Sequence, residues 1–175
     1  MNTRLFVDVF TGEVKAGADG CELTSHAIGS CVVVTAYDRK QKVGAMAHIM
    51  LPGKAPLKPR LEKTKYAADA VKKMMELLQG MGASMNALEI CLIGGGNVLK
   101  REDCRISSDN LFSIEKILRE LGFTVKKHAV GGIIRRTARL DTGNGCVYYS
   151  EDGSEEKLLW KSEGGVPLKQ DGNRP

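Results

Sequence analysis

Four polar residues between two apolar runs form the clearest pattern in the first third of the chain. The runs occupy residues 31–37 and 43–50, and the break between them is Asp38-Arg39-Lys40-Gln41. Two strand-like runs joined by a short polar turn predict a β-hairpin. Both faces of the first run are largely apolar, which is typical of a central strand in a layered α/β fold.

The register of this hairpin brings a cysteine and a histidine together. If residues 38–41 form the turn, Tyr37 faces Lys42, and the same register places Cys31 directly opposite His48. Opposed residues have Cβ atoms about 4.5–5.5 Å apart, so a thiol could meet an imidazole, as in an activated cysteine nucleophile. A one-residue bulge would separate the two side chains, and the pattern alone is equally consistent with core packing.

Two later segments have the periodicity of amphipathic helices. They cover residues 66–81 and 108–121, and in each the apolar side chains recur at intervals of three and four. Glycines at or just after the end of each segment are typical helix stops. We therefore predict two helices, each with one face in the core.

The remaining strands are predicted to be short. They lie at residues 5–14 with a turn at Thr11-Gly12, at 87–93, at 123–128, and in a second hairpin of 137–140 with 146–149. Residues 21–30 are rich in small and hydroxyl side chains and are expected to form a loop. Paired strands with two helices between them predict an α/β fold, a layered sandwich of mostly antiparallel β-strands flanked by helices.

The length of 175 residues suits a single domain with a substantial core. We expect this domain to span residues 1–150. From Glu151 onward the chain is polar and rich in glycine except for Leu158-Leu159-Trp160. Residues 151–175 are therefore expected to form a flexible tail that is poorly tied to the domain.

Composition limits the location and the partners. No apolar stretch approaches the roughly 20 residues that cross a membrane, and the first residues lack the apolar core of a signal peptide. We therefore expect a cytoplasmic protein without membrane insertion. The formal charge is +5, but aromatic residues make up only 5% of the chain and do not alternate with basic ones. This argues against nucleic acid as a partner and favours an acidic protein surface.

Cysteine spacing excludes two common structural roles. The chain has five cysteines, an odd number, with no CxxC pair and no zinc-type grouping; they stand at positions 21, 31, 91, 104 and 146. Free thiols are expected, with no metal and no cofactor. The run Gly94-Gly95-Gly96 matches neither common phosphate-binding motif, so it predicts a tight turn or a close backbone approach.

Several sequence blocks in collinear order resemble the CheD family of chemotaxis proteins. The most specific are residues 28–34, which contain Gly-Ser-Cys, and residues 43–52, which end in Ala-His-Ile-Met-Leu-Pro. Lys65-Tyr66-Ala67, the glycine run, residues 106–110, and Gly131-Gly132 with Arg136 follow in the same order. The resemblance covers roughly residues 5 to 150. It implies a layered fold shared with the deamidase domain of cytotoxic necrotising factor toxins.

The resemblance also implies an activity and its residues. CheD proteins are chemoreceptor glutamine deamidases, which convert receptor glutamines to glutamates by a cysteine–histidine mechanism. Cys31 would be the nucleophile and His48 the base. The hydroxyl residue six positions before the cysteine falls on Ser25, where the family typically has threonine. Thr24 is the alternative if the loop is shifted by one residue.

The implied reaction has a covalent intermediate. His48 would take the thiol proton, Cys31 would form a thioester with the substrate, and water would hydrolyse it to glutamate. Backbone N–H groups near Gly29, Ser30 and Cys31 are candidate donors to the oxyanion.

Other functions remain open on the same residues. CheD relatives bind the phosphatase CheC, so the chain could act chiefly as a regulatory partner of a CheC-type phosphatase. A cysteine hydrolase or transglutaminase acting on other amides would use the same triad. In the leading hypothesis the substrates are the cytoplasmic domains of chemoreceptors. Lys54, Lys58 and Arg60 would then contact acidic faces of the receptor helices.

Overall fold

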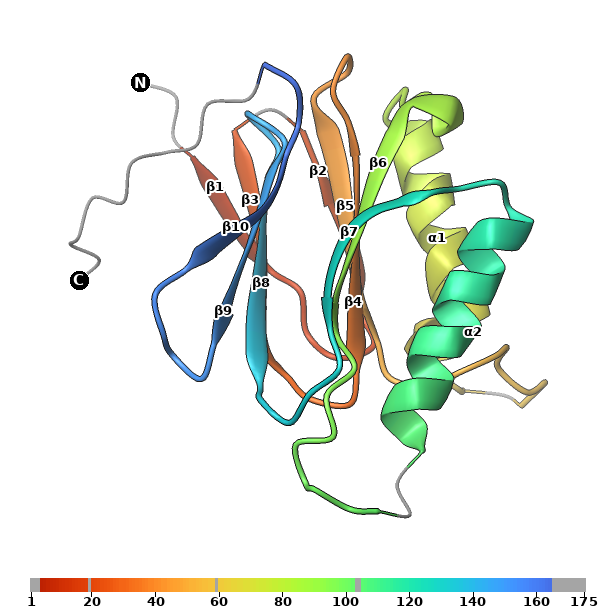
Figure 1. The fold of residues 1–175 in the computed structure, drawn as a ribbon. Helices are drawn as coiled ribbons and strands as arrows, with labels where there is room; N and C mark the ends of the chain where they lie inside the picture. The colour runs from red at the N-terminus through yellow and green to blue at the C-terminus, as the bar shows by residue number, and fades with distance from the viewer. Residues whose placement is uncertain (1–3, 19, 59, 103–104, 165–175) are drawn as a thin grey trace.

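The computed structural model describes residues 4–18, 20–58, 60–102 and 105–164. Two five-stranded β-sheets face each other, and two α-helices cover the outer face of the second sheet (Figure 1). Most strand pairs are antiparallel, and the β1–β3 and β6–β7 pairs are parallel. The architecture is therefore the predicted α/β layered sandwich.

The strands of the first sheet, in spatial order, are β1 (Leu5–Asp8), β3 (Cys21–Ile28), β8 (Arg136–Asp141), β9 (Cys146–Glu151) and β10 (Lys157–Lys161). Those of the second sheet are β2 (Val14–Gly17), β5 (Val43–Ile49), β4 (Val32–Asp38), β6 (Leu88–Gly94) and β7 (Val125–Val130). The helices are α1 (Ala67–Gly80) and α2 (Ile106–Glu120), with short 3₁₀ turns at Lys63–Lys65 and Met85–Ala87. None of the described helices is both long and apolar enough to pass through a membrane.

Most predicted elements are present. The hairpin of residues 31–37 and 43–50 is β4 and β5, and the helices predicted at 66–81 and 108–121 are α1 and α2. β6, β7 and the β8–β9 hairpin also lie where the pattern predicts strands. These elements share a strong hydrophobic period or a clear turn signal, which explains why the sequence suffices to find them.

The expectation of a loop at residues 21–30 is wrong, because Cys21–Ile28 forms β3. This strand lies inside its sheet, between β1 and β8, and Leu23, Ser25 and Ile28 are fully buried. Small and hydroxyl side chains favour a strand only weakly by themselves, and pairing on both edges overrides that preference.

The predicted tail from Glu151 onward contains a strand, β10, which pairs antiparallel with β9. Trp160 of this strand packs against the core between the two sheets, and its Nε1 donates to the carboxylate of Glu89 (3.0 Å). The sheet therefore continues past the domain boundary expected at residue 150. Residues 165–175 lie outside the described part of the chain.

The β4–β5 register differs from the predicted one by two residues. Val33 pairs with His48, and Asp38 pairs with Val43, so the turn is residues 39–42 instead of 38–41. Moving a turn by one residue shifts the pairing by two, which preserves the face of every side chain. Cys31 is therefore not directly opposite His48, although both belong to the same face of the sheet.

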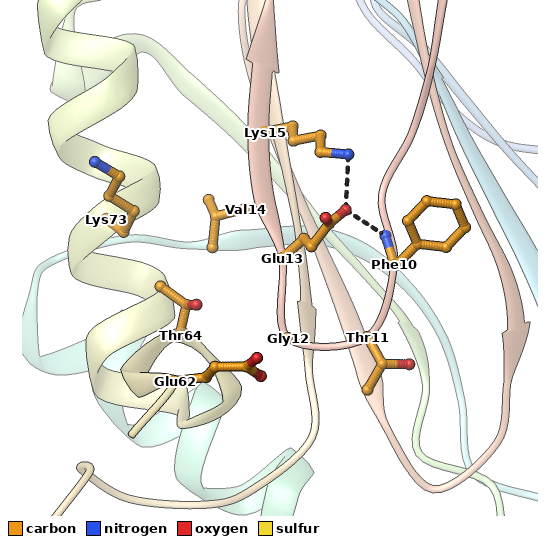
Figure 2. Close-up of a pocket in the computed structure, with 9 residues that line it drawn as sticks. All are labelled: Phe10, Thr11, Gly12, Glu13, Val14, Lys15, Glu62, Thr64 and Lys73. Atoms are coloured by element: carbon orange, nitrogen blue, oxygen red, sulfur yellow. Dashed lines mark hydrogen bonds and ion pairs between the residues drawn. The ribbon is translucent and has the colours of Figure 1, made fainter. Parts of the chain in front are cut away.

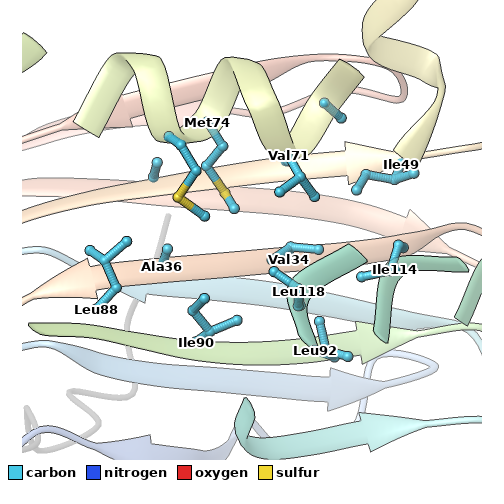
Figure 3. Close-up of a cluster of buried hydrophobic side chains, with 14 of the residues drawn as sticks. Val34, Ala36, Ile49, Val71, Met74, Leu88, Ile90, Leu92, Ile114 and Leu118 are labelled. Carbon is cyan, nitrogen blue, oxygen red and sulfur yellow. The ribbon is translucent and has the colours of Figure 1, made fainter. Parts of the chain in front are cut away.

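The second sheet is covered on both sides. Its outer face packs against the two helices in one hydrophobic cluster, with Val34, Ala36 and Ile90 facing Met74 and Leu118 (Figure 3). Its inner face packs against the first sheet in a second cluster. Every residue of β4 and β5 is buried, as predicted for central strands. The inner cluster is the layer in which the candidate site lies.

Candidate functional site

A serine from one sheet and a histidine from the other meet in the inner layer. Ser25 lies on β3 and His48 on β5, and Ser25 Oγ is 2.8 Å from His48 Nδ1. Both side chains are almost completely buried. The contact crosses between the two sheets, so each sheet contributes one member of the pair.

The structure places Ser25, and not Thr24, beside His48. Neighbouring residues of a strand point to opposite faces, and Ser25 faces the inner layer while Thr24 is only partly buried. Just after Ser25 the β3–β8 register shifts, with Ala27 at a φ of 54°. A bulge of this kind often redirects a strand next to a functional site.

The hydrogen bonds around Ser25 assign the proton on His48. Ser25 Oγ donates its single proton to the backbone carbonyl of Val9 (2.6 Å). The same oxygen must then accept a proton from His48 Nδ1. His48 Nε2 is left as the unprotonated nitrogen, the one that can accept a proton from a nucleophile.

Cys31 lies in the short connection that passes from β3 in the first sheet to β4 in the second. It is partly buried, packs against the inner cluster and lines a surface cavity. His48 belongs to the same inner face but does not line that cavity. Cys31 therefore lies between the cavity and the inner cluster.

The predicted thiol–imidazole hydrogen bond is not formed in this structure: His48 Nε2 is buried and has no hydrogen-bond partner among the described residues. Burial raises the pKa of the Cys31 thiol, and a hydrogen bond from its own backbone N–H partly opposes this shift. Burial lowers the pKa of His48, against the opposing effect of the Val9 carbonyl. Both shifts favour a neutral thiol and a neutral imidazole at rest.

The glycine run at the end of β6 holds the Cys31 connection in place. Gly95 N donates to Cys31 O (2.7 Å), and Gly96 N donates to Gly29 O (2.8 Å). Gly94 has a φ of +114°, and a Cβ built there would lie 2.5 Å from Cys31 O. The expected close backbone approach is confirmed, and its partner is the segment that contains Cys31.

The backbone N–H groups of this connection have a different environment. Within the described part of the chain, the N–H groups of Gly29, Ser30 and Cys31 donate to no other backbone group. The N–H of Cys31 lies close enough to its own sulfur to affect the thiol pKa. These N–H groups remain candidate donors to a substrate carbonyl that approaches the sulfur.

The cavity beside Cys31 has a volume of about 400 Å³ and combines polar backbone with apolar side chains. Its walls come from the Cys31 connection, the segment after the glycine run, the start of α2, and Arg135. Sequence reasoning missed Val98, Leu99 and Arg135 as wall residues. Their one signal in the sequence is that Val98 and Leu99 closely follow the run ending at Gly96, and that Arg135 closely follows Gly131-Gly132.

A second cavity of about 440 Å³ lies between the loop before β2, the 3₁₀ turn at Lys63–Lys65 and α1 (Figure 2). In it Glu13 accepts hydrogen bonds from Lys15 and from the backbone N–H of Phe10. Its walls include no cysteine, serine or histidine, so it offers no counterpart to the Cys31 thiol that lines the first cavity. The described residues also contain no cluster of three or more potential metal-ligating side chains.

Four of the five cysteines are described, and all four are free thiols. Cys21, Cys91 and Cys146 are buried, and burial raises the pKa of Cys91 to about 12. Cys104 lies outside the described residues. Cys31 is therefore the described cysteine with access to a cavity.

Comparison with known proteins gives consistent relatives. The family model described as CheD chemotactic sensory transduction matches residues 50–151. A Chlorobium luteolum protein named "Probable chemoreceptor glutamine deamidase CheD" is 38% identical over 151 residues, which is 86% of this chain and 75% of the relative. The chemoreceptor glutamine deamidase CheD of Thermotoga maritima is 35% identical over 133 residues, 75% of this chain and 82% of the relative.

The matches differ in whether they reach the candidate site. The family model begins its match at residue 50, after Ser25, Cys31 and His48. An Archaeoglobus fulgidus protein, also named "Probable chemoreceptor glutamine deamidase CheD", is 32% identical over 165 residues. That match covers 91% of this chain and 99% of the relative, too much of the chain to leave out residues 25–48.

Proposed function

The chain belongs to the CheD family, and on that premise we propose that it is a chemoreceptor glutamine deamidase with Cys31 as nucleophile, His48 as base and Ser25 as the residue that orients His48. The observation that best supports this proposal is the hydrogen-bond chain from Val9 O through Ser25 Oγ to His48 Nδ1. It leaves Nε2 as the nitrogen that can accept a proton, in the inner layer against which Cys31 packs.

The first step is attack on the amide. The glutamine side chain enters the cavity, and Cys31 Sγ bonds to the carboxamide carbon while His48 Nε2 takes the thiol proton. Because burial favours the neutral pair, His48 acts as a general base during attack, and no preformed thiolate is required. The N–H of Cys31, with those of Gly29 and Ser30, donates to the oxyanion of the tetrahedral intermediate.

The second step regenerates the enzyme. The imidazolium of His48 returns its proton to the leaving amide nitrogen, which departs as ammonia and leaves a thioester on Cys31. His48 then takes a proton from water, which attacks the thioester carbonyl. Collapse of this second intermediate releases glutamate and restores the thiol. The net reaction consumes one water and releases one ammonia for each glutamine.

The Sγ–Nε2 hydrogen bond is absent without substrate, and the mechanism requires it only during attack. Catalytic hydrogen bonds are often long or unmade in ligand-free enzymes and form in the substrate complex. Cys31 and His48 are diagonal neighbours in the extended β4–β5 register, a relation in which larger side chains still reach each other.

Ammonia release from purified chemoreceptor cytoplasmic fragments tests the proposal. We expect wild-type protein to release ammonia and Cys31→Ala to release none. Cys91→Ala is a matched control, because Cys91 is a free cysteine that faces the same inner layer but is fully buried. Undiminished release by the Cys31→Ala variant, with the modified glutamines located by mass spectrometry, would show that another residue performs the chemistry.

The location and the second partner stay predictions. A deamidase acting on receptor cytoplasmic domains would work in the cytoplasm. Binding of a CheC-type phosphatase would be measured by titration with the Cys31→Ala variant, which separates binding from turnover.

A further inference from the structure

The β4–β5 ladder ends immediately before the two catalytic segments diverge. Its last pair is Val32 with Ile49. The next residues outward are Cys31, just before β4, and Met50, just after β5. Backbone groups beyond this point have no partner in the ladder. A contact that joins these two segments beyond the ladder would therefore restrain the position of Cys31 relative to His48.

One side chain from α2 makes this connection. Asn110 is fully buried, and its Nδ2 donates to Ser30 O (3.2 Å) and to Met50 O (2.8 Å). Ser30 directly precedes Cys31, and Met50 follows His48 by two residues. A single amide group therefore links the segment with the nucleophile to the strand with the base.

The chemistry of this link is restrictive. Two backbone carbonyls cannot bond to each other, and both are satisfied by one group only if it has two donor hydrogens. A primary carboxamide supplies two N–H donors without placing a charge in the core. The two acceptors also fix which end of the amide faces them, since the carbonyl oxygen of the same side chain could bond neither.

The contact completes the restraint on Cys31. On one side, Gly95 N holds the Cys31 carbonyl. On the other, Asn110 holds the carbonyl of the preceding residue, and Asn110 Oδ1 itself is buried and has no hydrogen-bond partner in the part of the chain that the structure describes. The orientation of the amide is therefore set by the two carbonyls alone.

We propose that Asn110 is a positioning residue of the deamidase, which sets the separation of Cys31 and His48 by holding together the ends of the two segments that contain them. This inference rests on the proposed function. It assigns Asn110 no contact with substrate. Its effect is to reduce the displacement needed for Sγ to reach Nε2, and errors of about 1 Å in such geometry reduce rates by about 100-fold.

The test uses Asn110→Ala and the near-isosteric Asn110→Asp, with Ser113→Ala as control. Ser113 also lies on α2 and accepts a backbone hydrogen bond, but its partner is Gly53 N (2.8 Å) and not one of the two carbonyls that Asn110 joins. Fluorescence of Trp160 and thermal unfolding establish that each variant is folded at the assay temperature. The two measurements are kcat and KM for receptor fragments, and the rate of Cys31 alkylation by iodoacetamide as a function of pH, followed by peptide mass spectrometry.

We expect both Asn110 variants to lower kcat by about 100-fold while KM changes by less than about 3-fold. Their Cys31 alkylation profile should resemble that of His48→Ala, because His48 Nε2 can no longer accept the thiol proton as the sulfur attacks iodoacetamide. Ser113→Ala should match wild type in both measurements. The Asn110→Asp variant keeps the size of the side chain, so it remains informative if Asn110→Ala does not fold.

Two results would overturn the proposal. One is a folded Asn110 variant with wild-type kcat. The other is a folded variant of lower thermal stability whose alkylation profile is that of wild type, since the residue would then be purely structural. The alkylation measurement needs no receptor. If wild-type protein does not deamidate receptors but the Asn110 variants still shift the profile, the proposed function fails and the positioning role holds.

Discussion

Ser25 determines which nitrogen of His48 is basic. Its hydroxyl has one proton, and the Val9 carbonyl takes it, so the oxygen can only accept from Nδ1. A threonine at this position would offer the same hydroxyl. The departure from the family's typical residue therefore leaves the chemistry of the hydrogen-bond chain unchanged.

Replacing Ser25 tests whether this residue orients His48 without contributing to substrate binding. We expect Ser25→Ala to reduce kcat by about 10- to 100-fold with little change in KM, because His48 loses the partner that fixes its tautomer. Ser25→Thr should retain activity. Thr24→Ala, one residue away on the other face of β3, is the control, and ammonia release from receptor fragments is the measurement. Equal losses in the Thr24 and Ser25 variants would contradict the assignment.

The same two residues predict the acidic limb of the pH profile. His48 must be neutral to accept the thiol proton, and burial lowers its pKa below the usual value of 6.5. Protonation therefore removes activity only when the pH falls below about 6.5, and kcat/KM should still be at its plateau at neutral pH. A profile of kcat/KM from pH 5 to 8 checks this. An acidic limb centred above 6.5 would contradict the lowered pKa of His48.

At the scale of elements, sequence patterns predicted the strands that contain the candidate residues but not the geometry between those residues. The apolar runs around Cys31 and His48 predict both strands because their period and turn signal are local. Asp38 supports the observed turn, because its carboxylate accepts hydrogen bonds from the backbone N–H groups of Lys40, Gln41 and Ser84. Ser84 is far away in the sequence, so no local pattern could place the turn. The role of Asn110 was hidden for the same reason.

The end of β6 should be intolerant of any side chain. We expect Gly94→Ala to destabilise the fold by about 2 kcal/mol or more, because its φ of +114° is unfavourable for alanine and its Cβ would overlap the Cys31 carbonyl. Urea unfolding measures this, and the kcat of the folded fraction should also fall. Gly80→Ala, at the end of α1, is the control: apart from its chain neighbours and the backbone of α1 itself, no atom of the described residues lies within 4 Å of a Cβ built there. It should stabilise the protein by about 0.5–1 kcal/mol, and a similar loss at both sites would exclude crowding as the cause.

At the scale of the molecule, the candidate site is assembled only when the two sheets pack. Ser25 belongs to the first sheet and His48 to the second, and Cys31 lies in the segment that crosses between them. Away from the site, the Tyr37 hydroxyl donates to Thr142 O (3.1 Å) across the same layer. The sequence gives no indication of which sheet each strand joins, because that choice depends on the packing of the whole inner layer.

β10 should contribute to the stability of this packing without contributing to the chemistry. Trp160 packs against the inner layer and bonds to Glu89 at the start of β6, whereas the Cys31 connection meets the opposite end of that strand at Gly94. We expect Trp160→Ala to lower the free energy of unfolding by about 2–3 kcal/mol, less than for a fully buried tryptophan.

Urea unfolding and deamidase assays on the same preparations test this separation. Leu158→Ala is the control on β10, because Leu158 is 45% exposed and its loss should change stability by no more than about 0.5 kcal/mol. Well below its unfolding temperature, the Trp160→Ala variant should retain kcat within about 2-fold of wild type, since additivity holds for distant sites. A large loss of kcat in fully folded protein would mean that the placement of the sheets at β10 controls the geometry of Ser25 and His48 at the other end of the layer.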